Sequence, residues 1–227
     1  MRLDRMAEDV DQWAMAKQKI TSRTAAANNT KATILDAAET LFAQKGYDGT
    51  SLQEICDLAQ VARGTPSYFY GSKEKLYQAV LDRSLAMSSV VVQLSSQRAA
   101  QSNASARDAL QMAVELLFDF FITHPKFVRI TEWEGLSGGK RLGSLPALVG
   151  VLRESVSVLH GQLGWPGDAE QFLIDLVALC WFPVAHAETF LEPLGVDANA
   201  PDFIEKRKRH VVERLLGKPA PALGEID

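Results

Sequence analysis

Side chains between residues 50 and 73 have the chemistry that a contact with DNA requires. Arg63 carries a guanidinium group that can clamp a phosphate or read the edge of a base, and Lys73 is a second cationic donor. Gly64 has no side chain, so another backbone can approach it closely. The residue types and their spacing predict eight contacts with DNA, from Thr50, Ser51, Arg63, Gly64, Thr65, Ser67, Tyr68 and Lys73.

Three short helices must hold these side chains in place. Apolar residues recur every three or four positions between residues 34 and 42, which predicts a helix that Gly46 ends. Ser51 with Glu54 three residues later fits a capping box, so a second helix begins there. A tight turn follows, and residues 62 to 70 form the third helix. Two helices joined by such a turn are a helix-turn-helix, whose second helix enters the major groove.

Three blocks of this stretch resemble the tetracycline-repressor (TetR) family of bacterial regulators. They are residues 46–51 (GYDGTS), 61–65 (VARGT) and 71–77 (GSKEKLY), which agree in register over about fifty residues. The resemblance implies a transcriptional repressor that a small-molecule effector releases from a palindromic operator in double-stranded DNA. It also implies a homodimer with an N-terminal helix-turn-helix domain and a C-terminal helical domain for effector binding and dimerisation.

This chain departs from the family pattern at three positions. Gln60 stands where many relatives have a turn glycine, and a positive φ is disfavoured for glutamine. Pro66 is tolerated only in the first turn of a helix, so it should delay the third helix, with Thr65 as its cap. Ser67 stands where many relatives have a phosphate-binding tyrosine, and Tyr68 is the candidate to replace it.

The composition is that of a globular protein. Of 227 residues, 47% are hydrophobic and 23% are charged, which suffices for a sizeable core. No signal peptide and no run of about twenty apolar residues is evident, so we expect a cytoplasmic protein without a membrane partner. Cys56 and Cys180 fall in separate helical patterns, which predicts buried free thiols rather than a disulfide or a metal pair.

The charge balance is unusual for a protein that binds DNA. The formal net charge is −4, and residues 31 to 83 hold six basic and seven acidic side chains. Arg63, Lys73 and Lys75 nevertheless cluster at the proposed DNA-facing edge. We therefore expect only modest affinity for DNA of arbitrary sequence.

The first 30 residues precede the DNA-reading helices. An apolar stripe at helical spacing predicts an amphipathic helix over residues 3–20, and residues 22–30 read as a polar linker. One interpretation is a basic arm that touches DNA through Lys17, Lys19 and Arg23. The other is a loosely packed extension.

Apolar helical segments fill the rest of the chain, and no alternating strand pattern is present, so the predicted fold class is all-α. We expect about nine helices, to which the N-terminal extension would add one. The predicted domains are an extension (1–30), a DNA-binding domain (31–77), an effector-binding and dimerisation domain (78–218) and a tail (219–227). The helical segments beyond the connecting fourth helix are residues 106–123, 126–136, 145–163, 169–191 and 201–216.

Catalytic motifs are incomplete. Residues 135–140 resemble a phosphate loop one residue short, and His186-Ala187-Glu188 lacks the cysteines of a zinc deaminase. The four histidines lie in separate segments. We therefore predict no enzyme activity, no cofactor and no metal, with a helical enzyme or a protein-binding adaptor carrying a vestigial DNA-binding head as the alternatives. The cationic run 206–209 reads as a solvated helix face.

The resemblance places the dimer interface on the last two long helices and the effector pocket within the C-terminal domain. The predicted interface residues are Phe172, Leu173, Leu176, Val177, Cys180, Val211, Val212 and Leu215. We expect a largely apolar effector, whose pocket is lined by aromatic or polar residues on apolar helices: Phe118, Phe121, Trp133, Glu134, Phe182 and His186. Pro183 should bend the helix that carries Phe182 and His186.

Overall fold

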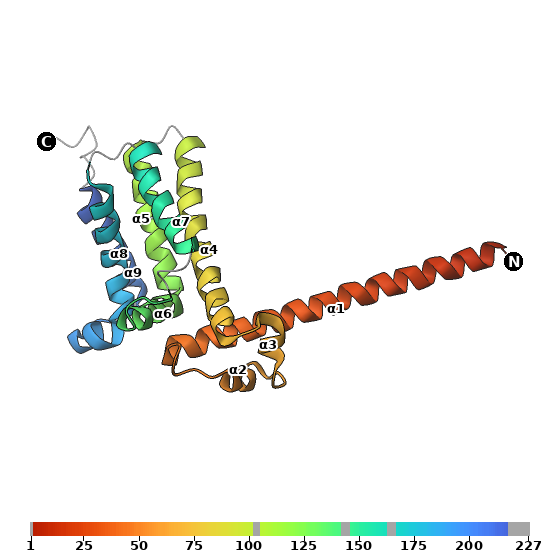
Figure 1. Ribbon diagram of the computed structural model, residues 1–227. Coiled ribbons are helices and arrows are strands. Elements are labelled where there is room, and N and C mark those ends of the chain that lie inside the picture. The colour runs from red at the N-terminus through yellow and green to blue at the C-terminus, as the bar shows by residue number, and fades with distance from the viewer. Residues whose placement is uncertain (1, 102–104, 142–145, 163–166, 218–227) are drawn as a thin grey trace. The chain divides into compact units, whose positions relative to one another are not determined.

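The computed structural model describes residues 2–101, 105–141, 146–162 and 167–217 (Figure 1), so the predicted tail, residues 219–227, lies outside the described residues. Within these ranges the chain is helical without a strand, which confirms the all-α class. The α-helices are α1 (Arg2–Lys45), α2 (Leu52–Ala59), α3 (Thr65–Tyr70), α4 (Lys73–Gln101), α5 (Ala106–Thr123), α6 (Pro125–Leu136), α7 (Pro146–Ser157), α8 (Ala169–Ala185) and α9 (Pro201–Leu216). Short π- or 3₁₀-helices are η1 (Val158–Gln162), η2 (Ala187–Leu191) and η3 (Glu192–Leu194).

The chain divides into two compact units, an N-terminal unit (Met1–Val80) and a C-terminal unit (Leu81–Asp227). In the N-terminal unit, α1 packs on α2 and α3. The fully buried Phe42 ring lies 4.8 Å from the ring of Tyr77 in an edge-to-face arrangement. Apolar side chains from α1, α2 and α4 complete this core, among them Ile34, Ala38, Leu41, Ile55, Cys56, Leu76 and Val80.

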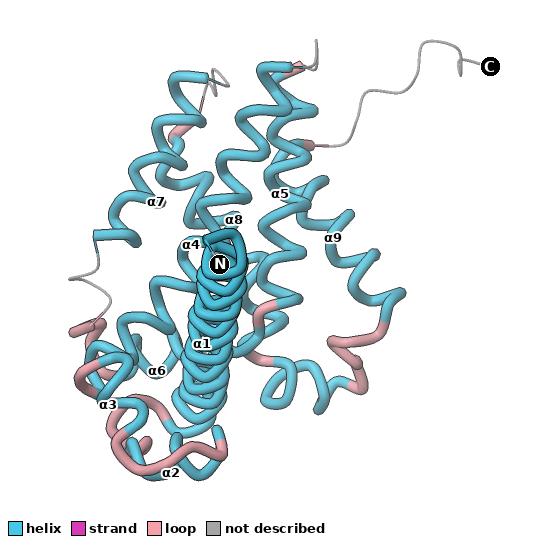
Figure 2. Tube along the Cα trace, turned by 90° about the vertical axis from the view of Figure 1, so that its right-hand side faces the viewer, coloured by secondary structure: helices cyan, strands magenta, loops and turns pink. Residues whose placement is uncertain are grey.

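The C-terminal unit is a helical bundle (Figure 2). Helix α5 packs against α8 and α9, and α6 and α7 both pack against α8. The bundle buries Val114, Phe118, Val128 and Val211 completely. Cys180 and the other cysteine, Cys56, are buried and free, as predicted.

The predicted polar linker at residues 22–30 is wrong, because α1 is one continuous helix from Arg2 to Lys45. The segment contains neither Gly nor Pro, so nothing in it breaks a helix. The hydroxyl groups of Thr30 and Thr33 donate to the carbonyls four residues earlier, at 3.0 Å each, which lets these polar residues stay helical.

The predicted helix over residues 169–191 is interrupted after Ala185, and the segments on either side are bent by 70°. Pro183 has no N–H, so the carbonyl of Leu179 loses its helical donor. The Arg207 guanidinium of α9 replaces that donor, with Nη2 2.9 Å from the Leu179 oxygen.

The run 206–209 is therefore only partly a solvated face. Arg207 is half-buried against α8, and Lys208 pairs with Asp119 of α5 at 2.7 Å, whereas Lys206 and Arg209 are exposed. The run of four cations suggested a single solvated face, but consecutive residues of a helix lie on different sides of it, so two of the four side chains contact other helices.

No single helix among the described residues is long and apolar enough to cross a membrane, although the bent pair Ala169–Ala185 and Ala187–Leu194 passes by length and composition.

Candidate DNA-binding site

The start of α2 is held by a complete capping box. Ser51 is the N-cap: its Oγ accepts from the Glu54 N–H, and the Ser51 N–H donates to Glu54 Oε2 at 2.8 Å. Lys45 Nζ also lies 2.5 Å from Glu54 Oε1. These contacts, that with Lys45 first, lower the pKa of Glu54 to about 2. The predicted capping box is confirmed, and Ser51 remains exposed at the end of the helix.

Thr50, in contrast, faces inward. Its side chain is 2% exposed, and its hydroxyl donates to the carbonyls of Gly46 at 2.8 Å and Leu41 at 3.2 Å. The hydroxyl thus closes the turn between α1 and α2. We therefore leave Thr50 out of the proposed contact set.

The turn between α2 and α3 uses a strained residue. Gln60 has φ 55° and ψ 42°, and it is the only residue other than glycine with a positive φ in the described part of the chain. The expectation that glutamine disfavours this conformation did not prevent it. The N–H groups of Gln60 and Val61 donate to the carbonyls of Asp57 and Cys56, and these bonds close the helix in place of a glycine.

Helix α3 begins at Thr65, three residues later than the pattern 62–70 suggested, as Pro66 in its first turn predicts. The predicted cap is wrong: Gly64, with φ 89°, is the N-cap, and the Thr65 hydroxyl donates back to the Ala62 carbonyl at 2.7 Å. Thr65 is half-buried.

The outer side of α3 and the turn before it are exposed. Arg63 and Gly64 in the turn and Ser67 on the helix are exposed, and the ring of Tyr68 is 84% exposed and lies edge-to-face with Phe69. Pro66, in contrast, is buried and holds the inner side. A large aromatic side chain left in solvent next to an arginine and a serine is a surface suited to phosphates and base edges.

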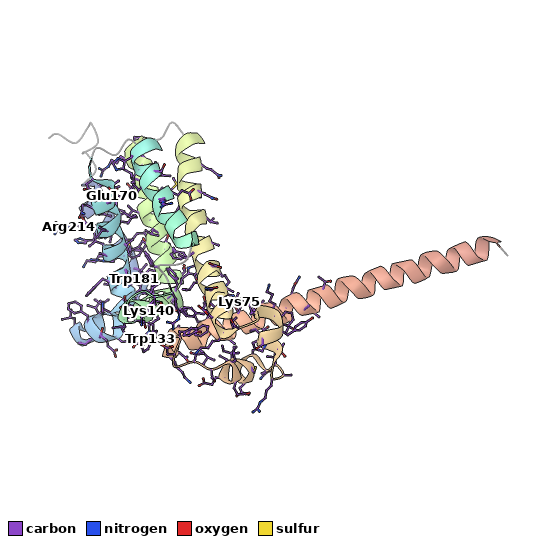
Figure 3. The ribbon with its side chains drawn as sticks, in the orientation of Figure 1. Lys75, Trp133, Lys140, Glu170, Trp181 and Arg214 are labelled. Carbon is purple, nitrogen blue, oxygen red and sulfur yellow. The ribbon has the colours of Figure 1, made fainter. Side chains whose placement is uncertain are left out.

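The start of α4 supplies the remaining cation. Lys73 is half-buried, with Nζ 4.2 Å from the centre of the Tyr47 ring. Ser72 Oγ accepts from the Lys75 N–H at 3.2 Å, and Lys75 itself is exposed (Figure 3). The structure thus places Ser51 at the cap of α2, Arg63 and Gly64 in the turn before α3, Ser67 and Tyr68 on α3, and Lys73 at the start of α4.

One contact of this unit had no signal in the sequence. The Tyr70 hydroxyl, at the end of α3, donates to the Lys31 carbonyl of α1 at 2.8 Å, and Lys31 Nζ lies 5.4 Å from the centre of the same ring. The two residues are 39 positions apart, so no local pattern pairs them. The contact ties α3 to a point on α1 just before its first buried residue, Ile34.

The predicted effector residues of the C-terminal unit lie in different environments. Phe118 and Phe121 are buried, Phe182 and Trp133 are about 40% exposed, and His186 is half-buried. Phe121 contacts Trp181 (labelled in Figure 3), which donates to Glu132 at 2.6 Å, whereas Phe182 contacts His186 and Phe190. The rings that contact Phe121 here are thus different from those that contact Phe182.

Glu134 is already engaged. Its side chain is almost fully buried, and its carboxylate accepts from the Arg141 N–H at 3.1 Å and from Arg141 Nη1 at 3.4 Å. A cavity of about 380 Å³ in this unit is lined by other residues, three of them carboxylates, and by none of the predicted six: Ala187, Glu188, Glu192, Gly195, Val196, Asp197, Ala198 and Asn199.

The predicted interface residues are mostly inside the protomer. Phe172, Leu176, Cys180, Val211 and Val212 are each at most 9% exposed, and Leu173, Val177 and Leu215 are half-buried. Burial raises the pKa of the Cys180 thiol to about 12, so it stays protonated near neutral pH.

Comparison with known proteins decides the family. Residues 34–80 match the family described as bacterial regulatory proteins of the tetR family, and residues 107–214 match a tetracycline-repressor-like C-terminal domain. The chain belongs to the TetR family. As a TetR-family member it is a DNA-binding transcriptional regulator, which confirms the resemblance and the predicted class of function.

Known TetR-family proteins resemble the chain over most of its length. The HTH-type transcriptional repressor NicS of Pseudomonas putida is 28% identical over 81% of this chain and 89% of its own. The HTH-type transcriptional regulator RutR of Escherichia coli K12 is 28% identical over 74% and 78%. A tetR-family regulatory protein from Rhodococcus RHA1 has the same fold, with a TM-score of 0.63, 17% identity and coverage of 84% and 98%.

Proposed function

We propose that this TetR-family protein is a homodimeric repressor that binds a palindromic operator through Ser51, the Arg63–Tyr68 segment and Lys73. The observation that carries the proposal is the exposed surface at α3, where Arg63 precedes the left-handed cap Gly64 and Ser67 and Tyr68 follow on the helix. Ser51 and Lys73 add a helix end on either side, where N–H groups and a cation attract phosphate.

A shift assay with the DNA upstream of its own gene tests this assignment. Arg63→Ala should weaken binding by about 1–3 kcal/mol, the value of a bidentate contact with guanine. Arg153→Ala removes another exposed arginine, from α7, and is the matched control. The assignment fails if the Arg63 and Arg153 variants bind alike, or if the wild-type protein does not shift this DNA.

We place the dimer interface on the exposed side of α8 and on α9. Ile174 is 58% exposed, and Ala178 and Phe182 follow it at four-residue spacing as exposed positions of the same helix face. An apolar stripe left in solvent on a long helix suits an interface between two copies. Ile174→Glu should give monomers in sedimentation, whereas Gln93→Glu on α4 should not, and a persistent dimer would exclude this face.

We keep a largely apolar small-molecule effector, bound within the C-terminal unit, as part of the proposal. His186 is the better polar group for it, because the Glu134 carboxylate is already paired with Arg141. Calorimetry of a candidate compound against free and operator-bound protein tests it. An effector that releases the operator must bind more weakly when the operator is present, and equal affinities would exclude that compound. A reducing cytoplasm suits the two free thiols.

A further inference from the structure

Helix α1 is much longer than the packing of the N-terminal unit requires. Its first buried residue among those described is Ile34, and none of the ten residues from Thr24 to Thr33 is buried. Figure 1 shows the N-terminal half of α1 extending beyond α2 and α3, the two short helices of that unit. A polar helix that extends beyond its own core is available to an external partner.

The charge of this arm is one-sided. From Gln12 to Leu35 the chain has 24 residues without a carboxylate, and four of them are basic: Lys17, Lys19, Arg23 and Lys31. All four acidic residues of the arm precede this stretch, at positions 4, 8, 9 and 11. A wholly positive stretch in a protein of net charge −4 fits a polyanion better than a protein surface of mixed charge.

The arm of α1 extends out of the N-terminal unit from a point beside α3. The Tyr70 hydroxyl of α3 holds the Lys31 carbonyl, so the arm starts at that point. Arg23 lies eight residues further out, about 12 Å along the helix axis, which is about the width of the major groove. Lys19 lies four residues beyond Arg23, about 18 Å from Lys31 along the axis, so the two residues span the distance at which the backbone bordering the groove would lie.

Helical register puts these two residues on the appropriate face. Arg23 is 11 residues before Ile34 and 18 before Leu41, spacings that return to one side of a helix with 3.6 residues per turn. Ile34 and Leu41 are buried where α1 packs on α2 and α3. Lys19, four residues before Arg23, lies on nearly the same side. In helical register, Lys19 and Arg23 therefore fall in line with the residues that are buried against the DNA-reading helices.

We propose that the arm of α1 is a second DNA contact, in which Lys19 and Arg23 bind backbone phosphates beside the groove that α3 reads. The contact is independent of base sequence, and it supplies the positive charge that residues 31 to 83 lack. This inference rests on the proposed function. The apolar stripe of residues 3, 6, 10 and 13 lies on a different side of α1, so pairing with a second copy is the competing interpretation.

The salt dependence of binding to a random-sequence duplex several turns long tests the proposal without knowledge of the operator. Each phosphate contact contributes about 0.9 to the slope of log K against log salt, so Lys19→Ala with Arg23→Ala should reduce the slope by about 2 per protomer, or about 4 for a bound dimer. The control is Arg2→Ala with Arg5→Ala, which removes the two arginines of the arm that precede the acid-free stretch. It should leave the slope unchanged. Lys19→Arg with Arg23→Lys keeps the charges and should restore it.

Three results would overturn the proposal. The first is an unchanged slope in the Lys19 and Arg23 variant, and the second is an equal loss of slope in the Arg2 and Arg5 control. The third is a truncated protein, lacking residues 2–22, that keeps the wild-type slope but has a different oligomeric state. The last result would assign the arm to self-association. Failure of the arm leaves the effect of Arg63→Ala in place, whereas failure of the proposed function removes it.

Discussion

The two units differ in where their predicted functional side chains lie. In the N-terminal unit, Arg63 lies exposed in the turn before α3, and Ser67 and Tyr68 lie exposed on α3, whose position follows from its cap and that turn. In the C-terminal unit, Phe118, Phe121 and Glu134 are buried instead. Most of the proposed DNA contacts are exposed side chains near helix ends, where local rules apply. A pocket or an interface depends on how long helices pack, and the apolar pattern that predicts packing does not distinguish them.

The largest expected effect concerns the core of the N-terminal unit. Phe42→Ala removes a fully buried ring that contacts Tyr47 and Tyr77, so we expect a loss of about 3–5 kcal/mol in the free energy of unfolding. Tyr68→Ala, at a ring 84% exposed on α3, should cost clearly less. Chemical denaturation measures both, and equal losses would mean that burial of the Phe42 ring is not the reason for its effect.

The second prediction concerns the cation that repairs the proline break in α8. Arg207→Ala leaves the Leu179 carbonyl without a donor and should cost about 1–3 kcal/mol. Arg209→Ala, two residues along and exposed, should stay within about 0.5 kcal/mol of the wild type. Thermal unfolding of the two variants compares them directly. If the Arg209 variant loses as much stability, the bond to Leu179 is not the reason.

A smaller effect is expected at the strained turn. Gln60→Gly should stabilise the N-terminal unit by up to about 1 kcal/mol, because a left-handed residue with a side chain carries a penalty that glycine avoids. Gln78→Gly, inside α4, should instead destabilise it by about 1 kcal/mol. Urea midpoints of both variants measure the difference, and a loss at position 60 would show that the Gln60 side chain stabilises the turn.

The smallest effect is a dependence on pH at the α2 cap. The lowered pKa of Glu54 means that its stabilising contribution is complete above its ordinary pKa of 4.5 and is lost as the pH falls through about 2. Lys45→Met removes the first cause of the shift, so the pKa of Glu54 should rise in carboxyl NMR titration. The stability difference between the two proteins should shrink below pH 4.5. A Glu54 pKa that stays low in the variant would assign the shift to Ser51 instead.

Much of the fold could be predicted because its signals are local. The Ser51 and Glu54 box, the delay of α3 by Pro66 and the apolar periods of α5, α6 and α9 all act within a few residues. Two contacts without a signal in the sequence are long-range. Arg207 reaches a carbonyl 28 residues away and Tyr70 one 39 residues away, so no sequence window contains both partners.

The functional residues divide in the same way. Gly64 replaced Thr65 as the cap, since glycine takes a positive φ without strain, and Thr50 went inside because its hydroxyl satisfies two carbonyls of α1 and the following turn. The effector and interface residues chosen from apolar helices stay predictions, and the exposed Ile174 and Phe182 now identify the side of α8 to test.

Selection of binding sites from random DNA tests the central claim, that α3 reads DNA sequence through Arg63, most directly. The wild-type protein should enrich a palindromic motif with half-sites about one helical turn apart or a multiple of it. Arg63→Ala should lose the preference at one symmetric position of each half-site and keep the others, whereas the Lys19 and Arg23 variant should enrich the unchanged motif with weaker binding. No enriched motif for the wild type, or an identical motif for Arg63→Ala, would contradict the account.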